Sequence, residues 1–522
     1  MKKVRKIFAL ILSCLMLFSV AACGGEDYSG EVIDDENDIL SGTINVRLLK
    51  TGFGTAWLDN VAAAFNEQYP DVKIKISGST ERLQVFGDVT GKSDKYDIIM
   101  LEYPLNDYLD CLEPIDDVYS YKNKGEDKSV ADKLIPLYLD YLNVKGHYYQ
   151  IPSFVGAYGL VYNSDYIYDN EVPVTTEEFK ALCKKLKNTD HLTPIIFAGA
   201  TGTEYWNFIY CTWFAQYEGR EAYNAALHGK AKNESGEYVF DPKTAYLDGG
   251  LKAMQVCEDL LWYDNGYIYT DSVAYTAFKE AQRDFLQGKA AIMYNGSWLV
   301  NEMQVLFPNG TDYDFKMMKV PVISAIREKC TTIYDDAELA ALVRAIDNGA
   351  TALSGSGYDV NEEDFAKVKD ARSFYYAGAE NATACVPVNA RNKTLAKRFL
   401  AFMYSDEGIM RHAEAKAGNV LPVRSSEFKR NVTSDNAFLN TSYDIMLNNE
   451  VFFNNPIIAV TPYCKSAKYS MIEKQFGSPS PSDRVRAEVS FNEKKELWTR
   501  NDNDKYWTEL ITSGLIKEKP QI

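Results

Sequence analysis

Residues 43–76, TINVRLLKTGFGTAWLDNVAAAFNEQYPDVKIKI, carry the pattern that decides the fold. Polar and apolar residues alternate over 43–48, which predicts a strand. Large apolar side chains then recur every four residues over 57–69, on one face of a predicted helix that Pro70 ends. Alternation returns over 72–76. Strand, helix and strand in this order predict an α/β sheet.

The same order continues along the chain. The apolar run 97–101 suits a parallel strand that is covered on both faces, and 159–162 reads as another strand. The sequence TTEE at 175–178 is a capping box, which predicts the start of a helix. Further helices are predicted over 244–262, 274–286 and 395–403. The order of predicted strands and helices is therefore that of an α/β protein along most of the chain.

The N-terminus has the layout of a secretory signal. Basic residues at 2–6 precede an apolar stretch over 7–20, and small residues then lead to Cys23. This arrangement resembles the lipobox of bacterial lipoproteins, in which the cysteine is diacylated. We expect a lipoprotein signal peptide over 1–22, a lipid anchor on Cys23 and a flexible tether over 23–41. An ordinary cleavage site or an uncleaved anchor is the alternative.

Charge and cysteine usage exclude several classes of function. A net charge of −17 argues against nucleic acid, whose phosphates need a basic face. Of nine cysteines, Cys14 and Cys23 fall in the signal and anchor, and the others form no disulfide framework. With four histidines in the chain we expect no metal site, and we expect no cofactor. The remaining cysteines, most of which we predict to be buried apolar residues, are Cys111, Cys183, Cys211, Cys257, Cys330, Cys385 and Cys464.

Five fragments, in order, resemble one family. They lie at 57–73, at 96–99 (YDII), at 149–163 (YQIP and GLVYN), at 285–298 (FLQGKAA and NGSW) and at 392–400 (NKTLAKRFL). The chain resembles the extracellular solute-binding proteins of ABC importers, in the carbohydrate-binding group that includes maltose-binding protein. That resemblance implies a two-lobed fold of type II, in which each lobe is a mostly parallel sheet flanked by helices and the ligand binds between the lobes.

The resemblance also implies a division of the chain. We expect lobe 1 to contain 42–155 and about 319–400, and lobe 2 to contain 156–318 and about 401–522. Residues 330–378 look like an insertion within this pattern. Gly156 stands where maltose-binding protein has a ligand-binding carboxylate, so a maltose-like set of ligand contacts is in doubt.

A sugar offers apolar C–H faces and a ring of hydroxyls, which aromatic rings and acidic or amide groups can bind. We expect the strand 290–294 to reach the cleft, Asn295 and Gly296 to turn the chain, and Trp298 to begin a helix that faces the ligand. In the family, the tryptophan at this position stacks on sugar. A core position is the alternative for Trp298, and Asn295 can equally serve only the turn.

Other candidates come from predicted strand ends, loops and the crossing between lobes. Glu102 follows the strand 97–101, so it should lie at the carboxyl end of that strand, and it can equally be a solvated loop residue. Trp57 and Trp206 are spaced as core residues as well as ligand contacts, and a surface position is the alternative for Arg424. The ligand-binding set we predict is Trp298, Asn295, Trp206, Tyr205, Tyr158, Glu102, Phe53, Trp57 and Arg424.

The function that the resemblance implies is a monomeric, lipid-anchored receptor on the outer face of the cell membrane. Such a receptor captures a sugar or oligosaccharide, closes on it and delivers it to the transmembrane permease subunits of an ABC importer, without catalysis. One alternative is the same fold with a peptide, polyamine or metal chelate as ligand. The other is a surface glycoside hydrolase, which needs two facing carboxylates.

Overall fold

The computed structural model describes residues 40–103, 105–200, 205–227, 230–241, 247–350, 360–378, 382–424, 434–452 and 472–499, with 508 and 511–512. The signal segment, Cys23 and the tether up to residue 39 lie outside these ranges, as do Cys464 and Trp507. No helix within the described ranges is both long enough and apolar enough to cross a lipid bilayer.

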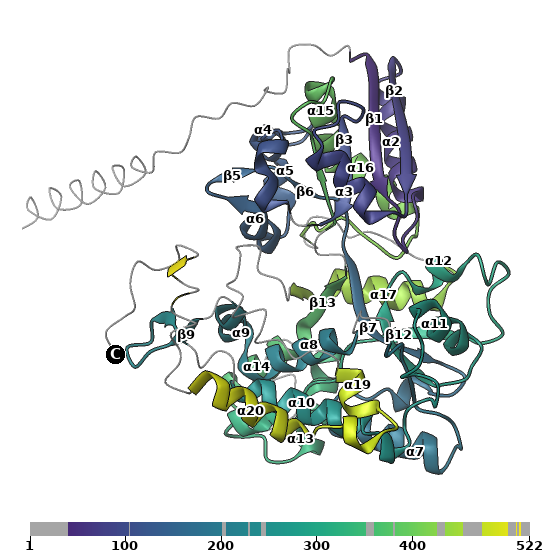
Figure 1. The fold of residues 1–522 in the computed structure, drawn as a ribbon, viewed down its shortest axis with the longest axis vertical. Coiled ribbons are helices and arrows are strands. Elements are labelled where there is room, and N and C mark those ends of the chain that lie inside the picture. The colour runs from purple at the N-terminus through teal and green to yellow at the C-terminus, as the bar shows by residue number, and fades with distance from the viewer. Residues whose placement is uncertain are drawn as a thin grey trace, which may run out of the picture.

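The described residues form two lobes, one above the other in Figure 1, each built on its own sheet. The sheet of the upper lobe, lobe 1, has the order β2-β1-β3-β14-β6. Strands β1, β2 and β3 are parallel, whereas β14 runs antiparallel to β3. The bounds are β1 Gly42–Leu49, β2 Val72–Ser79, β3 Ile98–Glu102, β14 Ala382–Cys385 and β6 Ile151–Pro152.

Helices cover the sheet of lobe 1. The predicted helix after β1 is confirmed as α2, and the periodic residues Trp57, Val61 and Phe65 lie on its buried face. The late helix predicted over 395–403 is also confirmed, as α15. The helices of this lobe are α2 Ala56–Gln68, α3 Arg82–Thr90, η1 Asn106–Cys111, α4 Asp116–Ser120, α5 Val130–Lys133, α6 Pro136–Leu142, α15 Lys393–Met403 and α16 Asp406–Glu414. A short hairpin joins β4 Asn143–Val144 to β5 His147–Tyr148.

The sheet of the lower lobe, lobe 2, has the order β15-β13-β7-β11-β8, with β12 also paired to β7. Strand β7 leads down from lobe 1 in Figure 1 and is antiparallel to β11, β12 and β13. The bounds are β7 Gly156–Asn163, β8 Ile195–Ile196, β11 Ile292–Gly296, β12 Phe315–Met318, β13 Phe374–Gly378 and β15 Glu450–Phe452.

Among the described strands of each main sheet, all but one run in the same direction, as expected, and the exceptions are β14 in lobe 1 and β7 in lobe 2. The reason for these exceptions is the path of the chain between lobes. A strand that arrives from the other lobe starts at the junction and runs away from it, as β7 and β14 do, whereas β1 and β3 run toward the junction. Ala382, the first residue of β14, therefore pairs with Glu102, the last residue of β3.

Helices also surround the sheet of lobe 2. The helix predicted from the TTEE pattern begins at Thr176 as α7, and the Thr175 hydroxyl accepts a hydrogen bond from the Glu178 N–H at 3.2 Å. The capping box is incomplete, because the Glu178 carboxylate accepts from the Val174 N–H at 2.9 Å instead of from the Thr175 N–H. A hairpin of β9 Lys230–Lys232 and β10 Tyr238–Phe240 follows α9. The helices are α7 Thr176–Asn188, α8 Trp206–Glu218, α9 Arg220–Leu227, α10 Asp248–Leu261, α11 Phe278–Leu286, α12 Leu299–Met303, α13 Asp336–Asp347, α14 Glu362–Ser373, α17 Ala437–Asn448, α19 Ile472–Gly477 and α20 Ala487–Thr499.

The division of the chain between lobes differs from the predicted one. Residues 319–378 were expected in lobe 1, but β13 pairs with β7, and α14 packs on α8, so this segment belongs to lobe 2. Residues 401–424 were expected in lobe 2, but α16 packs on α2 of lobe 1. The chain thus returns to lobe 1 between 378 and 382 and leaves it again between 424 and 434, later than the resemblance implied.

Backbone pairing joins two of the segments at this junction. The Val155 N–H donates to the Val420 carbonyl at 2.7 Å, and the Val420 N–H donates back at 3.0 Å. The Ile135 N–H also donates to the Pro422 carbonyl at 3.0 Å. The segment 418–424 is therefore held on both sides before the chain passes to lobe 2.

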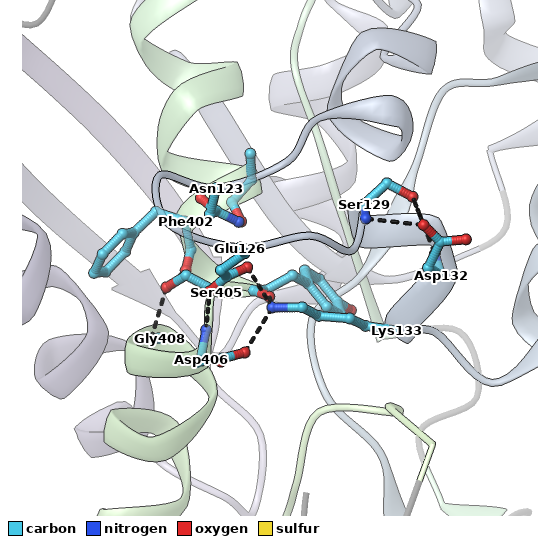
Figure 2. A network of polar contacts seen from close by, with 11 residues as sticks. Asn123, Glu126, Ser129, Asp132, Lys133, Phe402, Ser405, Asp406 and Gly408 are labelled. Atoms are coloured by element: carbon cyan, nitrogen blue, oxygen red, sulfur yellow. Dashed lines mark hydrogen bonds and ion pairs between the residues drawn. The ribbon is translucent and has the colours of Figure 1, made fainter. Parts of the chain in front are cut away.

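A buried lysine supports this segment from within lobe 1 (Figure 2). The Lys133 ammonium donates to Glu126 at 2.5 Å, to Asp406 at 2.8 Å and to the Tyr404 carbonyl at 3.0 Å. Glu126 also accepts from the Asp406 backbone N–H at 2.6 Å, at the start of α16. Because the Lys133 carbonyl accepts from the Arg424 N–H at 2.9 Å, the network fixes the place where the chain leaves lobe 1.

The six described cysteines are free, and all but Cys330 are buried, as predicted for most of them.

Candidate functional site

The turn after β11 lies later than the sequence suggested. Strand β11 runs through Asn295 and Gly296, so these residues do not form the turn, and the chain bends at Ser297 and Trp298. A Cβ atom on Gly296 would lie 2.0 Å from the Trp298 ring, which explains the glycine. Asn295 is fully buried, and its Oδ1 accepts from the Gly296 N–H at 2.7 Å. In this structure Asn295 offers no surface to a ligand.

Trp298 lies at the junction of the two lobes, at the N-cap of α12. Its ring meets Phe53 of lobe 1 edge to face at 5.6 Å, and Tyr158 of lobe 2 edge to face at 4.8 Å. Tyr205 lies further away, at 6.4 Å. With 9% of its surface exposed, Trp298 is both a packed residue and the centre of an aromatic cluster.

The cluster continues into lobe 2 through Tyr158. The Tyr158 ring stacks on Phe208 with centroids 4.4 Å apart, and it meets Tyr205 and Tyr376 edge to face at 5.6 Å each. Tyr158 and Tyr205 are partly buried and pack against the cores of both lobes. We call Phe53, Tyr158, Tyr205, Phe208, Trp298 and Tyr376 the aromatic cluster. It brings together four of the nine predicted ligand residues.

Carboxylates of both lobes border this cluster. Glu102, at the end of β3, forms an ion pair with Arg82 at 3.2 Å. Burial raises the pKa of the Tyr205 phenol, and the carboxylates of Glu302 and Glu102 raise it further, whereas contact with the Trp298 side chain opposes the shift. Tyr205 is therefore close enough to sense one acid from each lobe. Glu102 is the last residue of β3, so it lies at the carboxyl end of this strand, as predicted.

Three other predicted residues lie away from the accessible part of the cluster. Trp57 and Trp206 have no exposed surface, and each is in the core of its lobe. Arg424 is exposed and its Nε donates to the Leu134 carbonyl at 3.1 Å. Trp57 and Trp206 therefore occupy the core positions that the sequence analysis gave as their alternative, and Arg424 occupies the surface position given as its alternative.

Sequence reasoning missed Glu302 and Gln282. Glu302 follows Trp298 by four residues, so both lie on one helical face. The Gln282 Nε2 donates to the Glu302 carboxylate at 3.0 Å. The four-residue spacing was visible in the sequence, but a glutamate on a short helix is usually a solvated residue.

A cavity of about 1100 Å³ lies on another side of α12. Residues of α12, α17 and the loop before β12 line it, and Lys416 of lobe 1 also contributes. None of the nine predicted ligand residues lines this cavity.

The fold and the aromatic cluster together define a class: two-lobed α/β proteins with a binding site where the lobes meet. A sequence profile of the bacterial extracellular solute-binding proteins matches residues 60–440, which is well over half of the chain. The chain belongs to this family.

Individual relatives agree with that assignment. The maltotriose-binding protein of Pyrococcus abyssi (strain GE5 / Orsay) is 25% identical over 194 residues, which are 37% of this chain and 35% of that protein. The GacH receptor of Streptomyces glaucescens, solved unliganded and with acarbose, superposes with a TM-score of 0.54 at 16% identity, over 88% of this chain and 99% of its own. The solute receptor AcbH gives 0.56 at 13% identity, over 88% and 100%. These structures support the fold.

Proposed function

We propose that the protein is a receptor for a sugar or oligosaccharide that serves an ABC importer. The observation that carries this proposal is the aromatic cluster around Trp298, which lies where the lobes meet and is bordered by carboxylates. Aromatic rings bind the C–H faces of a pyranose, and carboxylates accept hydrogen bonds from its hydroxyls. The same ligand class is supported by the maltotriose-binding relative, by GacH, which was solved with acarbose, and by AcbH, whose substrate preference is for β-D-galactopyranose.

In this proposal only some of the nine predicted ligand-binding residues contact the sugar directly. Tyr158, Tyr205 and Trp298 are the aromatic contacts, with Phe53 behind Trp298 and Glu102 as the polar contact from lobe 1. Asn295, Trp57 and Trp206 position these residues from the cores. Ligand binding favours a closed arrangement of the lobes to the extent that the ligand binds that arrangement more tightly.

The proposal includes the anchor and the partner. Diacylation of Cys23 holds the receptor at the outer face of the membrane, and a permease accepts the sugar from it. Replacement of Cys23 by serine in the full chain should release the protein from the membrane fraction into the soluble fraction. A Cys23→Ser protein that stays in the membrane fraction would contradict a lipid anchor.

Thermal unfolding with a ligand panel tests the ligand class. The chain from residue 24 is heated with mono- and oligosaccharides, amino acids and polyamines at millimolar concentration. A ligand at a hundred times its Kd adds about 2.7 kcal/mol to the free energy of unfolding and raises the midpoint by a few degrees. A shift with sugars alone supports the proposal. Shifts with polyamines or amino acids alone would replace the ligand class, and a panel with no sugar shift would contradict it.

A further inference from the structure

The close packing around Gly156 leaves no room for a carboxylate side chain at this position of the junction. Gly156 occupies the position at which the resemblance places a ligand-binding carboxylate. A Cβ atom at Gly156 would lie 2.4 Å from the Phe53 ring and 2.9 Å from the Ser297 hydroxyl. Contacts below 3 Å require the neighbours to move, so no side chain can project from this position without displacing Phe53. A carboxylate for the site has to come from another element.

Glu302 supplies a carboxylate from α12. It lies one helical turn after Trp298, and its backbone N–H donates to the Trp298 carbonyl at 2.8 Å. Its side chain is 12% exposed, which is unusual for a glutamate. Helix α12 also reaches lobe 1 directly, because the Asn301 amide donates to the Gly52 carbonyl. Glu302 therefore lies on a helix of lobe 2 that contacts lobe 1.

The hydrogen-bonding capacity of this carboxylate is only partly used. Its Oε2 accepts from Gln282 at 3.0 Å, whereas its Oε1 is 3.9 Å from the Lys279 ammonium, which is beyond hydrogen-bond distance. A carboxylate can accept about four hydrogen bonds. Gln282 is fully buried, and its Oε1 has no hydrogen-bond partner among the residues that the structure describes. The partly exposed Glu302 carboxylate thus keeps acceptor capacity for hydroxyl donors, whereas the Gln282 amide oxygen is buried.

We propose that Glu302 is the specificity-determining carboxylate of the site and accepts hydrogen bonds from adjacent hydroxyls of a pyranose placed against the aromatic cluster. Gln282 orients it. This inference rests on the proposed function, and it specifies the ligand further: a sugar with free neighbouring hydroxyls at the ring that contacts Trp298. Burial raises the pKa of Glu302 and so shows that water solvates this carboxylate poorly, which makes donors from a ligand more valuable to it.

The test uses calorimetric titration of the chain from residue 24 with the sugar that shifts its unfolding midpoint, and with the monodeoxy analogues of that sugar. We expect Glu302→Gln to weaken binding of the parent sugar by about tenfold to a hundredfold, the range for a hydrogen bond to a charged group. One or more deoxy analogues should lose this sensitivity and bind both proteins alike. Glu234→Gln, at an exposed glutamate in the turn between β9 and β10, is the matched control and should bind as the unaltered chain does.

The outcomes separate the inference from the proposed function. Equal affinity of Glu302→Gln and the unaltered chain for the parent sugar would overturn the inference and leave the receptor function intact. An equal loss for the parent sugar and every deoxy analogue would also overturn it, since it indicates that Glu302 only supports the fold. An unaltered chain that binds no sugar overturns the proposed function and the inference with it.

Discussion

Phe53 and Trp298 meet edge to face with ring centroids 5.6 Å apart and an angle of 80° between the rings, although they belong to different lobes. The contact closes one side of the aromatic cluster, and the partly exposed Tyr158 and Tyr205 lie on the lobe 2 side of Trp298. A ligand that takes the whole Trp298 face therefore has to separate the tryptophan from Phe53. A ligand bound at the proposed site would therefore be coupled to the relative position of the lobes through these two rings.

Replacement of Trp298 by alanine should weaken sugar binding at least tenfold, because the ring at the centre of the cluster is lost. It should also lower the unfolding midpoint, since Trp298 is 9% exposed and removal of a buried aromatic costs about 3–5 kcal/mol. Titration calorimetry at a temperature where circular dichroism shows a folded protein measures the affinity. Trp298→Phe keeps a ring and should recover most of the midpoint. A folded Trp298→Ala protein with unaltered affinity would remove Trp298 from the site.

Sugar affinity should fall as the pH is lowered, and the fall should begin at a higher pH than it would if Glu302 had the pKa of an ordinary glutamate. Burial raises the pKa of Glu302, and the hydrogen bond from Gln282 and the charge of Lys279 offset part of this shift. As the pH falls through the raised pKa, the carboxylate becomes protonated and loses acceptor capacity. The Tyr205 phenol, the other titratable group that senses Glu302, has a raised pKa and stays neutral at these pH values. Titrations between pH 4 and 8 should give a flatter profile for Glu302→Gln.

The raised pKa of Glu302 also predicts that Glu302→Gln is more stable than the unaltered chain at neutral pH. A carboxyl whose pKa is higher in the folded protein than in the unfolded one stabilises the fold when protonated, and this contribution is lost as the pH rises through the folded pKa. Ionised Glu302 therefore lowers the free energy of unfolding at neutral pH. Without ligand, Glu302→Gln should unfold at a higher temperature than the unaltered chain at pH 7, and the difference should shrink toward pH 4. A lower midpoint at pH 7 would contradict this assignment.

Gly156→Ala should destabilise the protein by about 1–3 kcal/mol, the range for an added group in a close-packed site. The cause is the 2.4 Å approach of the new Cβ to the Phe53 ring. Urea denaturation of Gly156→Ala, Phe53→Ala and the double variant measures the coupling. The alanine at 156 should cost less when Phe53 is already truncated. Strict additivity would show that Phe53 is not the obstacle.

Lys133→Met should destabilise the protein by about 3 kcal/mol, because it leaves Glu126 and Asp406 without their shared cation. Urea denaturation measures the loss. Lys95→Met, at an exposed lysine, is the control and should be near neutral. If Lys133→Met is equally harmless, the network in Figure 2 does not contribute to the stability of lobe 1.

Local periodicity predicted individual elements well. The alternation over 43–48 and the four-residue repeat from Trp57 to Tyr69 each depend on neighbours in the sequence, and β1 and α2 formed as expected. The direction of β14 and the lobe that holds β13 depend on pairing with strands more than two hundred residues away, such as β7, so no local pattern could reveal them.

The candidate site shows the same limit. Trp298, Tyr158 and Tyr205 could be predicted as one group because family members share a fold, and the resemblance therefore indicates which distant residues lie near one another. Trp57 and Trp206 had the spacing of core residues, and both are buried in the lobe cores. Glu302 was missed because burial of a charged side chain depends on what packs around it, here Gln282 on α11.

The paired backbone of Val155 and Val420 gives the junction a mechanical property. The two chain segments joined by this isolated bridge, with reciprocal hydrogen bonds of 2.7 and 3.0 Å, form one narrow ribbon. Such a ribbon flexes readily across its thin direction, but torsion about its long axis strains both bonds at once. A movement between the lobes that keeps this bridge would therefore have to bend both segments together.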